Sequence, residues 1–426
     1  MLLEFTSKNF RSIKDEITLS LVRSKRSGLE ENSFEPSSSR CPPLLRSAAI
    51  YGPNAAGKSN IIKALDTMRD IVLESAEESQ RGKKLPLMAH AFSVETRQSP
   101  SEFEVIFIAN DGVRYQYGFA ATQNKVYEEW LLAYPKGLPQ RWLNRAYDEK
   151  SNNYIWELGD KLRGKKQIWK EATRSNALFL STAIQLNSEQ LKPVFDWFST
   201  HLRVAGIGGW SPSFSVSQCE KLESKTRILD MLRAADIGII DIQLQKEKFD
   251  SRKLSPDIPP DIRHQIIDSM EGEEIIDLKA IHETEENGRV SLDFNDESDG
   301  TRKLFAFAGP WLNTLDNGYV LVIDELHDNF HPKIVKFLVK LFHNSEINKK
   351  NAQLIFTTHE TSILNQEIFR TDQIWFCDKK SDQSTRLYPL TDFSPRKDYE
   401  NLEKSYLEGR YGAVPFIQEL KEAMGF

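Results

Sequence analysis

The chain has 426 residues, of which 39% are hydrophobic and 28% charged, as in an ordinary globular protein with a sizeable core. Its net charge of -6 gives no global attraction to nucleic acid, so any such contact would need a local basic patch. Three scattered cysteines, no signal peptide and no run of about 20 apolar residues argue against disulfides, secretion and a membrane span. We therefore expect a cytoplasmic protein without a membrane partner and, from its histidine and cysteine spacing, without a zinc site.

Strand and helix signals alternate in the first 164 residues. The elements expected from residues 1–80 are strands at 2–5 and 17–22, a turn at 9–12, a polar loop at 24–43, a buried strand at 47–51 and, after a glycine-rich loop, a helix from 58 to about 78. Residues 101–158 predict a β meander with strands at 103–108, 113–119, 126–134 and 154–158. The turn Asn110-Asp111-Gly112 predicts a hairpin between the first two of these strands.

The rest of the chain begins with a mostly helical pattern from 165 to 270 and returns to strands at 275–294. The elements expected after residue 300 are a helix at 302–316, a buried strand at 319–323, a helix at 332–343 and strands at 353–358 and near 373–377. This alternation predicts an α/β fold with a mixed central sheet and an antiparallel N-terminal β part. We divide the chain into an N-terminal lobe (1–164), a mainly helical insertion (165–287) that would be a lid or a surface for dimerisation or a partner, and a C-terminal lobe (288–426).

Residues 52–59, Gly-Pro-Asn-Ala-Ala-Gly-Lys-Ser, match the phosphate-binding pattern GxxxxGK[ST]. Its glycines let backbone N–H groups turn toward a phosphate, Lys58 would neutralise the β- and γ-oxygens, and the Ser59 hydroxyl would bind Mg²⁺. A glycine turn with a surface lysine is the alternative, but the buried strand before the loop and the helix after it argue against that. The predicted nucleotide-binding residues are Gly52, Pro53, Asn54, Ala55, Ala56, Gly57, Lys58, Ser59 and Asn60.

Four apolar residues, Val320 to Ile323, precede Asp324 and Glu325, as in a Walker B strand. A carboxylate at the end of a buried strand can reach the Mg²⁺ held by Ser59, which is the role we predict for Asp324. Glu325 is then placed to accept a proton from the attacking water. An acidic pair ending a strand is usually structural, and it is the phosphate loop that favours the catalytic interpretation.

Two further motifs follow the same logic. Ser298 and Gly300 lie in Glu-Ser-Asp-Gly-Thr, 24 residues before Asp324 counting from Gly300, where a turn and helix cap is the plain interpretation. A hydroxyl, a bare glycine and a helix N-terminus can also bind a γ-phosphate, as in an ABC signature. His359 ends an apolar strand, where a switch histidine would contact the γ-phosphate and the attacking water. His331 would lie either at a contact between the ATPase domains, or heads, of two copies of the chain or in the core of one copy.

Signature and switch histidine together single out the ABC class among the many P-loop NTPases. In that class the signature of one head covers the nucleotide in the other, so hydrolysis requires head-to-head pairing. We therefore predict ATP and Mg²⁺ as ligands, and a second copy of the chain as partner.

The sequence resembles the RecF/SMC-like ABC ATPases without long coiled coils, specifically the RloA-like ATP-binding proteins of bacterial restriction and phage-defence loci. The motifs that carry the resemblance are Asn9–Ser12, Ala49–Asn54, 297–301, Ile323–Leu326 with His331-Pro332, Gln353–His359 and the tail 406–415. The resemblance implies that Phe10 and Arg11 lie near the nucleotide, although locally they could equally end a strand. The sequence departs from the family at His327 and Asn329, where an aspartate and a serine are more usual.

The resemblance also implies that the ATPase acts in antiviral defence, where it would control a separate effector protein, often a nuclease or toxin. Only 67 residues follow His359, too few for a fused nuclease domain, so we expect no nuclease activity of its own. The alternative is a RecF-type ATPase that binds DNA in repair or chromosome maintenance. The best basic-aromatic segment for nucleic acid is 156–170 with Trp156 and Trp169, although a solvated helix face is favoured there. A transporter subunit is disfavoured, because Glu-Ser-Asp-Gly-Thr replaces the usual signature.

Overall fold

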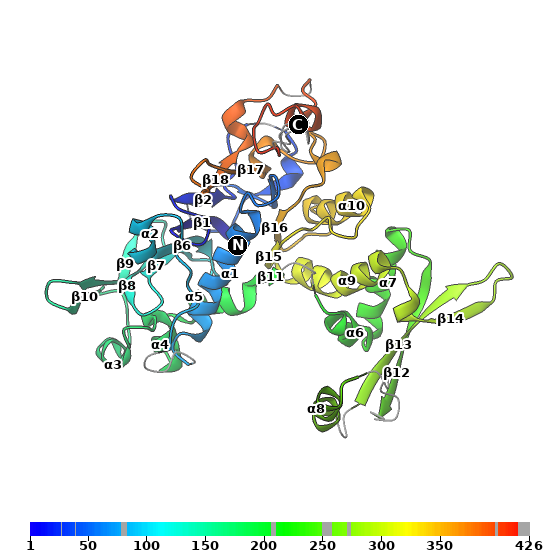
Figure 1. Ribbon diagram of the computed structural model, residues 1–426, viewed down its shortest axis with the longest axis horizontal. Coiled ribbons are helices and arrows are strands. Elements are labelled where there is room, and N and C mark those ends of the chain that lie inside the picture. The colour runs from blue at the N-terminus through cyan, green and yellow to red at the C-terminus, as the bar shows by residue number, and fades with distance from the viewer. Residues whose placement is uncertain are drawn as a thin grey trace, which may run out of the picture. The chain divides into compact units, whose positions relative to one another are not determined.

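The computed structural model describes residues 1–26, 28–38, 40–77, 83–205, 210–248, 258–270, 274–396 and 399–415. The chain forms two compact units, unit 1 (Met1–Gly208 with Thr314–Phe426) and unit 2 (Gly209–Asn313). Unit 1 is thus built from both ends of the chain, with unit 2 inserted between them (Figure 1). The three parts expected from the sequence, with boundaries at 164/165 and 287/288, differ from these two units, and that division stays a prediction. None of the described helices is both long and apolar enough to cross a membrane.

A six-stranded sheet forms the centre of unit 1. Its spatial order is β11 (Leu202–Ala205), β15 (Val320–Ile323), β16 (Gln353–Thr357), β5 (Ser47–Tyr51), β17 (Ile374–Lys379) and β18 (Thr385–Pro389). The first five strands are parallel, and β18 pairs antiparallel with β17. Every residue of β15, β16 and β5 is buried, which explains why their side chains are mostly apolar or small. Because these three neighbours are parallel, their carboxyl ends lie at one edge of the sheet.

Helix α1 (Lys58–Glu74) connects this sheet to a second one. It contacts β11 of the parallel sheet and also β1 and β6 of the antiparallel sheet (Figure 1). Its buried side chains include Ile61, Leu65 and Met68, which recur at helical spacing and form one apolar face. Helix α10 (Pro332–His343) packs on β16 and β5. The phosphate-loop strand therefore has buried surroundings that fix its position.

The second sheet of unit 1 is antiparallel and confirms the predicted N-terminal β part. Its spatial order is β10 (Asn153–Leu158), β9 (Gln140–Asp148), β8 (Val126–Tyr134), β7 (Arg114–Ala121), β6 (Ser101–Ile108), β1 (Leu2–Lys8) and β2 (Ile17–Ser20). The remaining regular elements of unit 1 are β3 (Ser33–Phe34), β4 (Leu44–Leu45), α2 (Val94–Gln98), α3 (Lys166–Ala172), α4 (Phe179–Gln185), α5 (Lys192–Asp196), the π-helical turn Trp197–His201 and α11 (Leu402–Leu407). The predicted hairpin joins β6 and β7.

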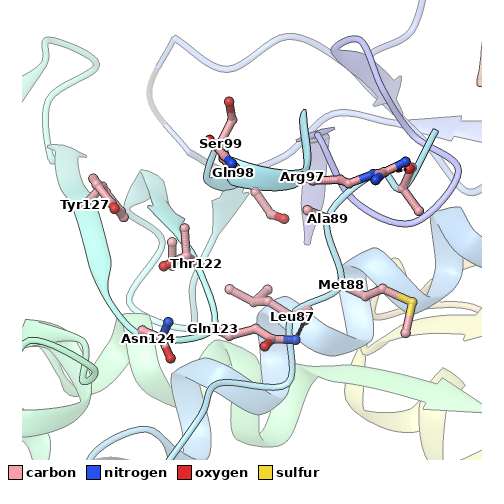
Figure 2. Close-up of a pocket in the computed structure, with 13 residues that line it drawn as sticks. Leu87, Met88, Ala89, Arg97, Gln98, Ser99, Thr122, Gln123, Asn124 and Tyr127 are labelled. Carbon is pink, nitrogen blue, oxygen red and sulfur yellow. Dashed lines mark hydrogen bonds between the residues drawn. The ribbon is translucent and has the colours of Figure 1, made fainter. Parts of the chain in front are cut away.

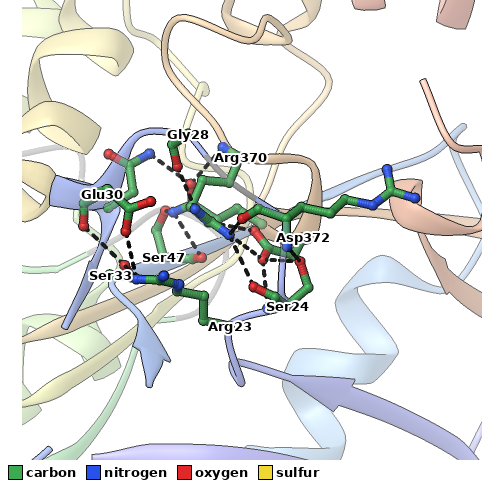
Figure 3. A network of polar contacts seen from close by, with 11 residues as sticks. Arg23, Ser24, Gly28, Glu30, Ser33, Ser47, Arg370 and Asp372 are labelled. Carbon is green, nitrogen blue, oxygen red and sulfur yellow. Dashed lines mark hydrogen bonds and ion pairs between the residues drawn. The ribbon is translucent and has the colours of Figure 1, made fainter. Parts of the chain in front are cut away.

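A buried polar network ties the N-terminal loop of unit 1 to its C-terminal part, at the amino ends of β5 and β17 (Figure 3). Arg370 and Asp372 form a two-pronged ion pair with Nε–Oδ1 and Nη2–Oδ2 distances of 2.9 Å. Asp372 also accepts from the Ser24 amide and hydroxyl at 2.8 and 2.7 Å. Gln373 donates to the Ser47 hydroxyl, which also contacts His343 Nε2 at 2.8 Å. Residues far apart in the sequence are thereby held together by hydrogen bonds at the amino end of β5, the strand before the phosphate loop.

Unit 2 combines helices with a three-stranded antiparallel sheet. Its elements are α6 (Ser213–Cys219), α7 (Leu222–Ala234), β12 (Ile239–Lys248), α8 (Pro260–Met270), β13 (Glu274–Glu283), β14 (Arg289–Asp293) and most of α9 (Asp299–Asn317). The sheet order is β12-β13-β14. The mostly helical pattern predicted for 165–270 is therefore wrong at β11 and β12. In β12 the buried Ile239 and Ile242 face the protein, while the residues around them are largely polar.

Helix α9 contains Pro310, whose ring nitrogen cannot donate to the carbonyl of Ala306. Ser215 of α6 compensates, because its hydroxyl donates to Ala306 O at 3.2 Å and accepts from Gly309 N at 3.0 Å. A Cβ at Gly309 would lie 2.7 Å from the Ser215 hydroxyl, so glycine permits this close approach. Helix α9 can thus continue past its proline, and it begins three residues earlier than the sequence predicts.

Candidate functional site: the phosphate loop and its neighbours

The phosphate loop occupies the connection from β5 to α1 and depends on two glycines. Gly57, with φ +107°, directly precedes the helix, and a Cβ there would lie 2.0 Å from Thr385 Oγ1. A Cβ at Gly52 would lie 2.1 Å from the carbonyl oxygen of Cys377. Both positions exclude any side chain, since the loop is wedged against β17 and β18. The glycine positions of the sequence pattern are therefore required by packing as well as by backbone conformation.

Lys58 is buried, with 6% of its surface exposed, and its ammonium lies over the loop. Its Nζ donates to Gly52 O at 2.9 Å and Pro53 O at 3.0 Å, and lies 3.0 Å from His359 Nε2. Burial lowers the pKa of Lys58, while the nearby charges of Glu325 and Asp324 oppose that shift. The predicted lysine and histidine are therefore in contact, and the charges of the predicted acidic pair act on the same ammonium group.

The back of the loop is held by residues that the motif does not contain. Thr385 Oγ1 and Cys377 Sγ both donate to Ala56 O, at 2.9 and 3.4 Å. Burial raises the pKa of Cys377 to about 12, so the thiol keeps the proton that it donates. Ser12 Oγ bonds to Thr385 Oγ1 at 2.7 Å and accepts from Asn60 Nδ2 at 2.7 Å. In the sequence Ser12 is only one member of the motif Asn9–Ser12, and no local pattern indicates a role for Thr385 or Cys377 at the phosphate loop.

Asp324 and Glu325 leave the carboxyl end of β15, next to the end of β16. Asp324 is 4% exposed, and its Oδ1 accepts from the Thr357 hydroxyl at 2.6 Å. The same hydroxyl accepts from the Glu325 amide at 2.8 Å. Glu325 has φ +55°, an uncommon conformation for a residue with a side chain. Thr357 thus fixes both the Asp324 carboxylate and the backbone of Glu325, a function that the apolar strand pattern did not reveal.

His359 follows β16 by two residues and is half-buried. Burial, assisted by the charge of Lys58 and by His327, lowers the pKa of His359 to about 4, so its ring is neutral near pH 7. The ring of His327 meets it edge-on, with centroids 5.3 Å apart and planes at 80°. His331, by contrast, is exposed and caps α10 by accepting from the Lys333 amide at 3.2 Å. The structure thus brings His327, which was not a predicted site residue, into the site.

Phe10 and Arg11 lie in a turn between β1 and β2, where Arg11 has φ +51°. Phe10 is fully buried and packs edge-on against Phe103 at 5.4 Å, so its side chain supports the turn from the core. Arg11 N donates to Met88 O at 2.7 Å. Through the neighbouring Ser12 this turn reaches the phosphate loop. Direct contact of either side chain with a nucleotide stays a prediction.

Beside this turn lies a cavity of about 480 Å³, within the usual range of small-molecule sites of about 300–1,000 Å³ (Figure 2). Its walls are formed by residues 87–89 and 91, residues 97–99 and 101, and the turn 121–124, together with Tyr127. The residues predicted to bind nucleotide are not among its lining residues.

Ser298 and Gly300 belong to unit 2, which is described by itself. Ser298 is exposed and caps α9, because its hydroxyl accepts from Thr301 N at 3.1 Å. Glu297 is bonded to His282 Nε2 of β13 at 2.6 Å, which anchors the turn. The plain helix-cap interpretation therefore holds within the unit, and cross-head binding of a γ-phosphate stays a prediction. In the basic-aromatic segment, Trp169 is buried against Phe179 and so cannot stack on a base.

Three solved structures illustrate the similarity of this chain to known proteins. The SMC head domain from Thermotoga maritima is 12% identical with a TM-score of 0.39, covering 91% of this chain and 98% of that one. The Smc head from Pyrococcus furiosus bound to the C-terminal domain of ScpA is 11% identical, with a TM-score of 0.45 and coverages of 91% and 96%. The recombination mediator RecF with ATP is 13% identical, with a TM-score of 0.36 and coverages of 91% and 99%. No curated protein matches the chain.

The parallel sheet, the glycine-rich loop at the end of β5 and the acidic end of β15 define an α/β domain of the P-loop type. A family model described as "AAA domain, putative AbiEii toxin, Type IV TA system" matches residues 47–365, well over half of the chain. The chain belongs to this family of ATPase domains.

Proposed function

We propose that the protein binds and hydrolyses ATP at the phosphate loop, and that Ser298 and Gly300 of a second copy complete each site. The observation that carries the proposal is the convergence of three motifs from neighbouring parallel strands. Lys58 follows β5, Glu325 follows β15, and His359 follows β16, with Lys58 Nζ 3.0 Å from His359 Nε2. Ligands of open α/β sheets bind at such carboxyl ends.

The chain supplies the groups that Mg²⁺-ATP requires. Backbone N–H groups of residues 52–60 would cradle the phosphates, and Lys58 would turn its ammonium from the loop carbonyls to the phosphate oxygens. Ser59 and Asp324 would hold Mg²⁺, for which a hydroxyl and a carboxylate oxygen are suitable ligands. When bound, the ion would neutralise phosphate charge.

Glu325 would accept a proton from the water whose oxygen attacks the γ-phosphorus. The bond from that phosphorus to the bridging oxygen breaks, and the products are ADP and phosphate. Thr357 supports this role, because its hydroxyl fixes the backbone at Glu325. His359 would orient the water and the γ-phosphate.

We further propose that this ATPase is a sensor or regulator in an RloA-like antiphage module, controlling a nuclease or toxin encoded beside it. The proposal is supported by the sequence motifs at 9–12, 297–301 and 406–415 and by the toxin–antitoxin description of the family model. ATP would hold two heads together, and hydrolysis would release them. Co-purification of a second polypeptide with nuclease or toxin activity would support this role.

Glu325→Gln tests the chemistry. The amide cannot accept the proton, so we expect ATP binding to persist while turnover falls by at least 10²-fold, the lower range for a general base. The variant should accumulate as a paired-head form with ATP, visible by light scattering. Normal hydrolysis by the variant would show that the base is another residue.

A DNA-binding role of the RecF type makes a different prediction. Duplex DNA would then stimulate ATP hydrolysis, and its binding would weaken steeply with salt. The full chain should be assayed with and without duplex DNA at two salt concentrations. Salt-sensitive stimulation would replace the effector-control proposal by this alternative.

A further inference from the structure

We infer that His327 is a positioning residue that holds the backbone of His359 in place through its ring nitrogen. His359 N donates to His327 Nδ1 at 3.4 Å, and the two rings meet edge-on with centroids 5.3 Å apart. The inference rests on the proposed ATPase function, because it concerns how His359 is presented to the γ-phosphate. The chain therefore uses a side chain from the loop after β15 to fix the end of β16.

The surrounding backbone makes this contact well defined. Leu326 N donates to Thr357 O at 3.1 Å, which fastens the residue before His327 to β16. Asp328 N donates to Glu325 O at 3.0 Å and closes a tight turn around His327. Glu325, with φ +55°, starts that turn. The position of His327 is thus set from both sides by the same strand end that carries His359.

The hydrogen bonds determine which ring nitrogens accept. Lys58 has no acceptor on its ammonium, so its contact with His359 Nε2 at 3.0 Å requires a lone pair on that nitrogen. A backbone N–H likewise requires a lone pair on His327 Nδ1. Both rings are then neutral, in agreement with burial, which lowers the pKa of each. Position 327 requires a hydrogen-bond acceptor for the His359 amide, and a neutral imidazole provides one without adding a charge.

The charged groups near His327 explain why an uncharged hydrogen-bond acceptor suits this position. After burial, which lowers the pKa of His327, the nearby carboxylates of Glu325, Asp328 and Glu360 raise that pKa and the ammonium of Lys58 lowers it. Asp324 additionally acts on His359. A carboxylate at position 327 would add one more negative charge beside Lys58 and compete with phosphate for it. His327 can hold the His359 amide without doing so.

Two matched substitutions separate the hydrogen bond from the ring contact. His327→Asn keeps an acceptor near the position of Nδ1 and removes the ring, whereas His327→Phe keeps a ring and removes the acceptor. We expect His327→Phe and His327→Ala to lower kcat for ATP roughly tenfold, the loss of one modest positioning interaction, with little change in KM. His327→Asn should recover most of kcat. A Phe variant as active as wild type, or an Asn variant as poor as Ala, would overturn the inference.

Pairing with His359→Ala tests whether His327 acts through His359. If it does, the double variant His327→Ala/His359→Ala should be no slower than His359→Ala, because coupled residues are not additive. Multiplied losses would overturn the inference. If His359→Ala alone leaves turnover unchanged, the proposed role of His359 fails, whatever the effect at position 327.

A measurement without nucleotide separates the inference from the proposed function. The chain has eight histidines, so selective ¹⁵N-histidine labelling gives few backbone amide signals. We expect the His359 amide signal to shift in His327→Phe and to stay near its wild-type place in His327→Asn. The exposed His264→Ala serves as the control for labelling and assignment, and thermal unfolding confirms that each variant is folded. An unchanged His359 amide in the Phe variant would show that the hydrogen bond is absent.

Discussion

At the scale of single residues, the Thr357 hydroxyl has two tasks that no other described side chain shares. It donates to Asp324 Oδ1 at 2.6 Å and accepts from Glu325 N at 2.8 Å. Thr357→Val keeps the shape and removes both bonds, leaving a buried carboxylate short of a partner. We expect a loss of stability of about 1–3 kcal/mol and a clear fall in kcat, measured by denaturant unfolding and ATPase assays. Thr357→Ser should restore both, and an active Val variant would contradict the assigned role.

A substitution at Gly57 tests the effect of steric overlap, because a second glycine with positive φ offers a control without that overlap. Gly57→Ala would place a Cβ 2.0 Å from Thr385 Oγ1 at φ +107°. We expect ATP affinity to fall at least tenfold, the equivalent of about 1.4 kcal/mol, because the loop must shift. Gly112→Ala is the matched control, since it also has positive φ (+74°) but its Cβ would meet nothing within 4 Å. Equal affinities of the two variants, measured by titration calorimetry, would show that the overlap is relieved without cost.

The sequence singles out candidate site residues whose chemistry is tied to a fixed spacing, and their roles stay predictions. Lys58, Asp324 and His359 stand at recognisable places after apolar strands; Lys58 contacts His359, and the charge of Asp324 acts on Lys58. Thr357 and Thr385 act through contacts made by folding, over sequence separations that no local pattern encodes. In the sequence His327 stands out as a departure from the family and as half of a histidine pair with His331 that predicts no zinc site, although a polar residue beside the acidic pair is a usable signal.

At the scale of elements, the network beneath β5 contains a buried histidine with a strongly altered pKa. Burial, followed by the charges of Arg46 and Lys340, lowers the pKa of His343 from 6.5 to about 3. The unfolded chain therefore takes up a proton below about pH 6.5 that the folded chain refuses, and stability falls as pH decreases toward 3. From pH 7 to pH 5 we expect a loss of about 2 kcal/mol. His343→Gln should remove this part of the pH dependence in urea unfolding, and an unchanged slope would contradict the assignment.

The strands β9 and β11, which the sequence missed, have different physical reasons. In β9 the fully buried Arg145 interrupts the apolar pattern, because it pairs with the equally buried Glu129 at 3.5 Å and donates to Ala177 O. Charge compensation of this kind cannot be seen in hydropathy. Strand β11 is short and sits next to β15, far away in the sequence. The strands with uniform burial or a turn signal, such as β15 and the β6–β7 hairpin, were predicted correctly.

At the scale of the whole molecule, pairing of two copies is the step that the signature would control. Ser298 is exposed at the start of α9, so Ser298→Arg adds bulk and charge where a facing phosphate is expected. We expect the variant to remain monomeric with ATP in light scattering and to lose turnover, while nucleotide affinity of the monomer stays nearly unchanged. Loss of binding in the monomer would contradict the cross-head assignment. Ser298→Ala, which adds no bulk, is the control for the cap itself.

The order of strands in the parallel sheet has a consequence for biosynthesis. Strand β5, which ends in the phosphate loop, is flanked by β16 and β17, and these are about 300 residues later in the chain. The nascent polypeptide therefore carries an intact glycine motif long before its flanking strands leave the ribosome. A chain that ends before β15 would lack Asp324, Thr357 and His359, so it could not carry out the proposed ATP hydrolysis.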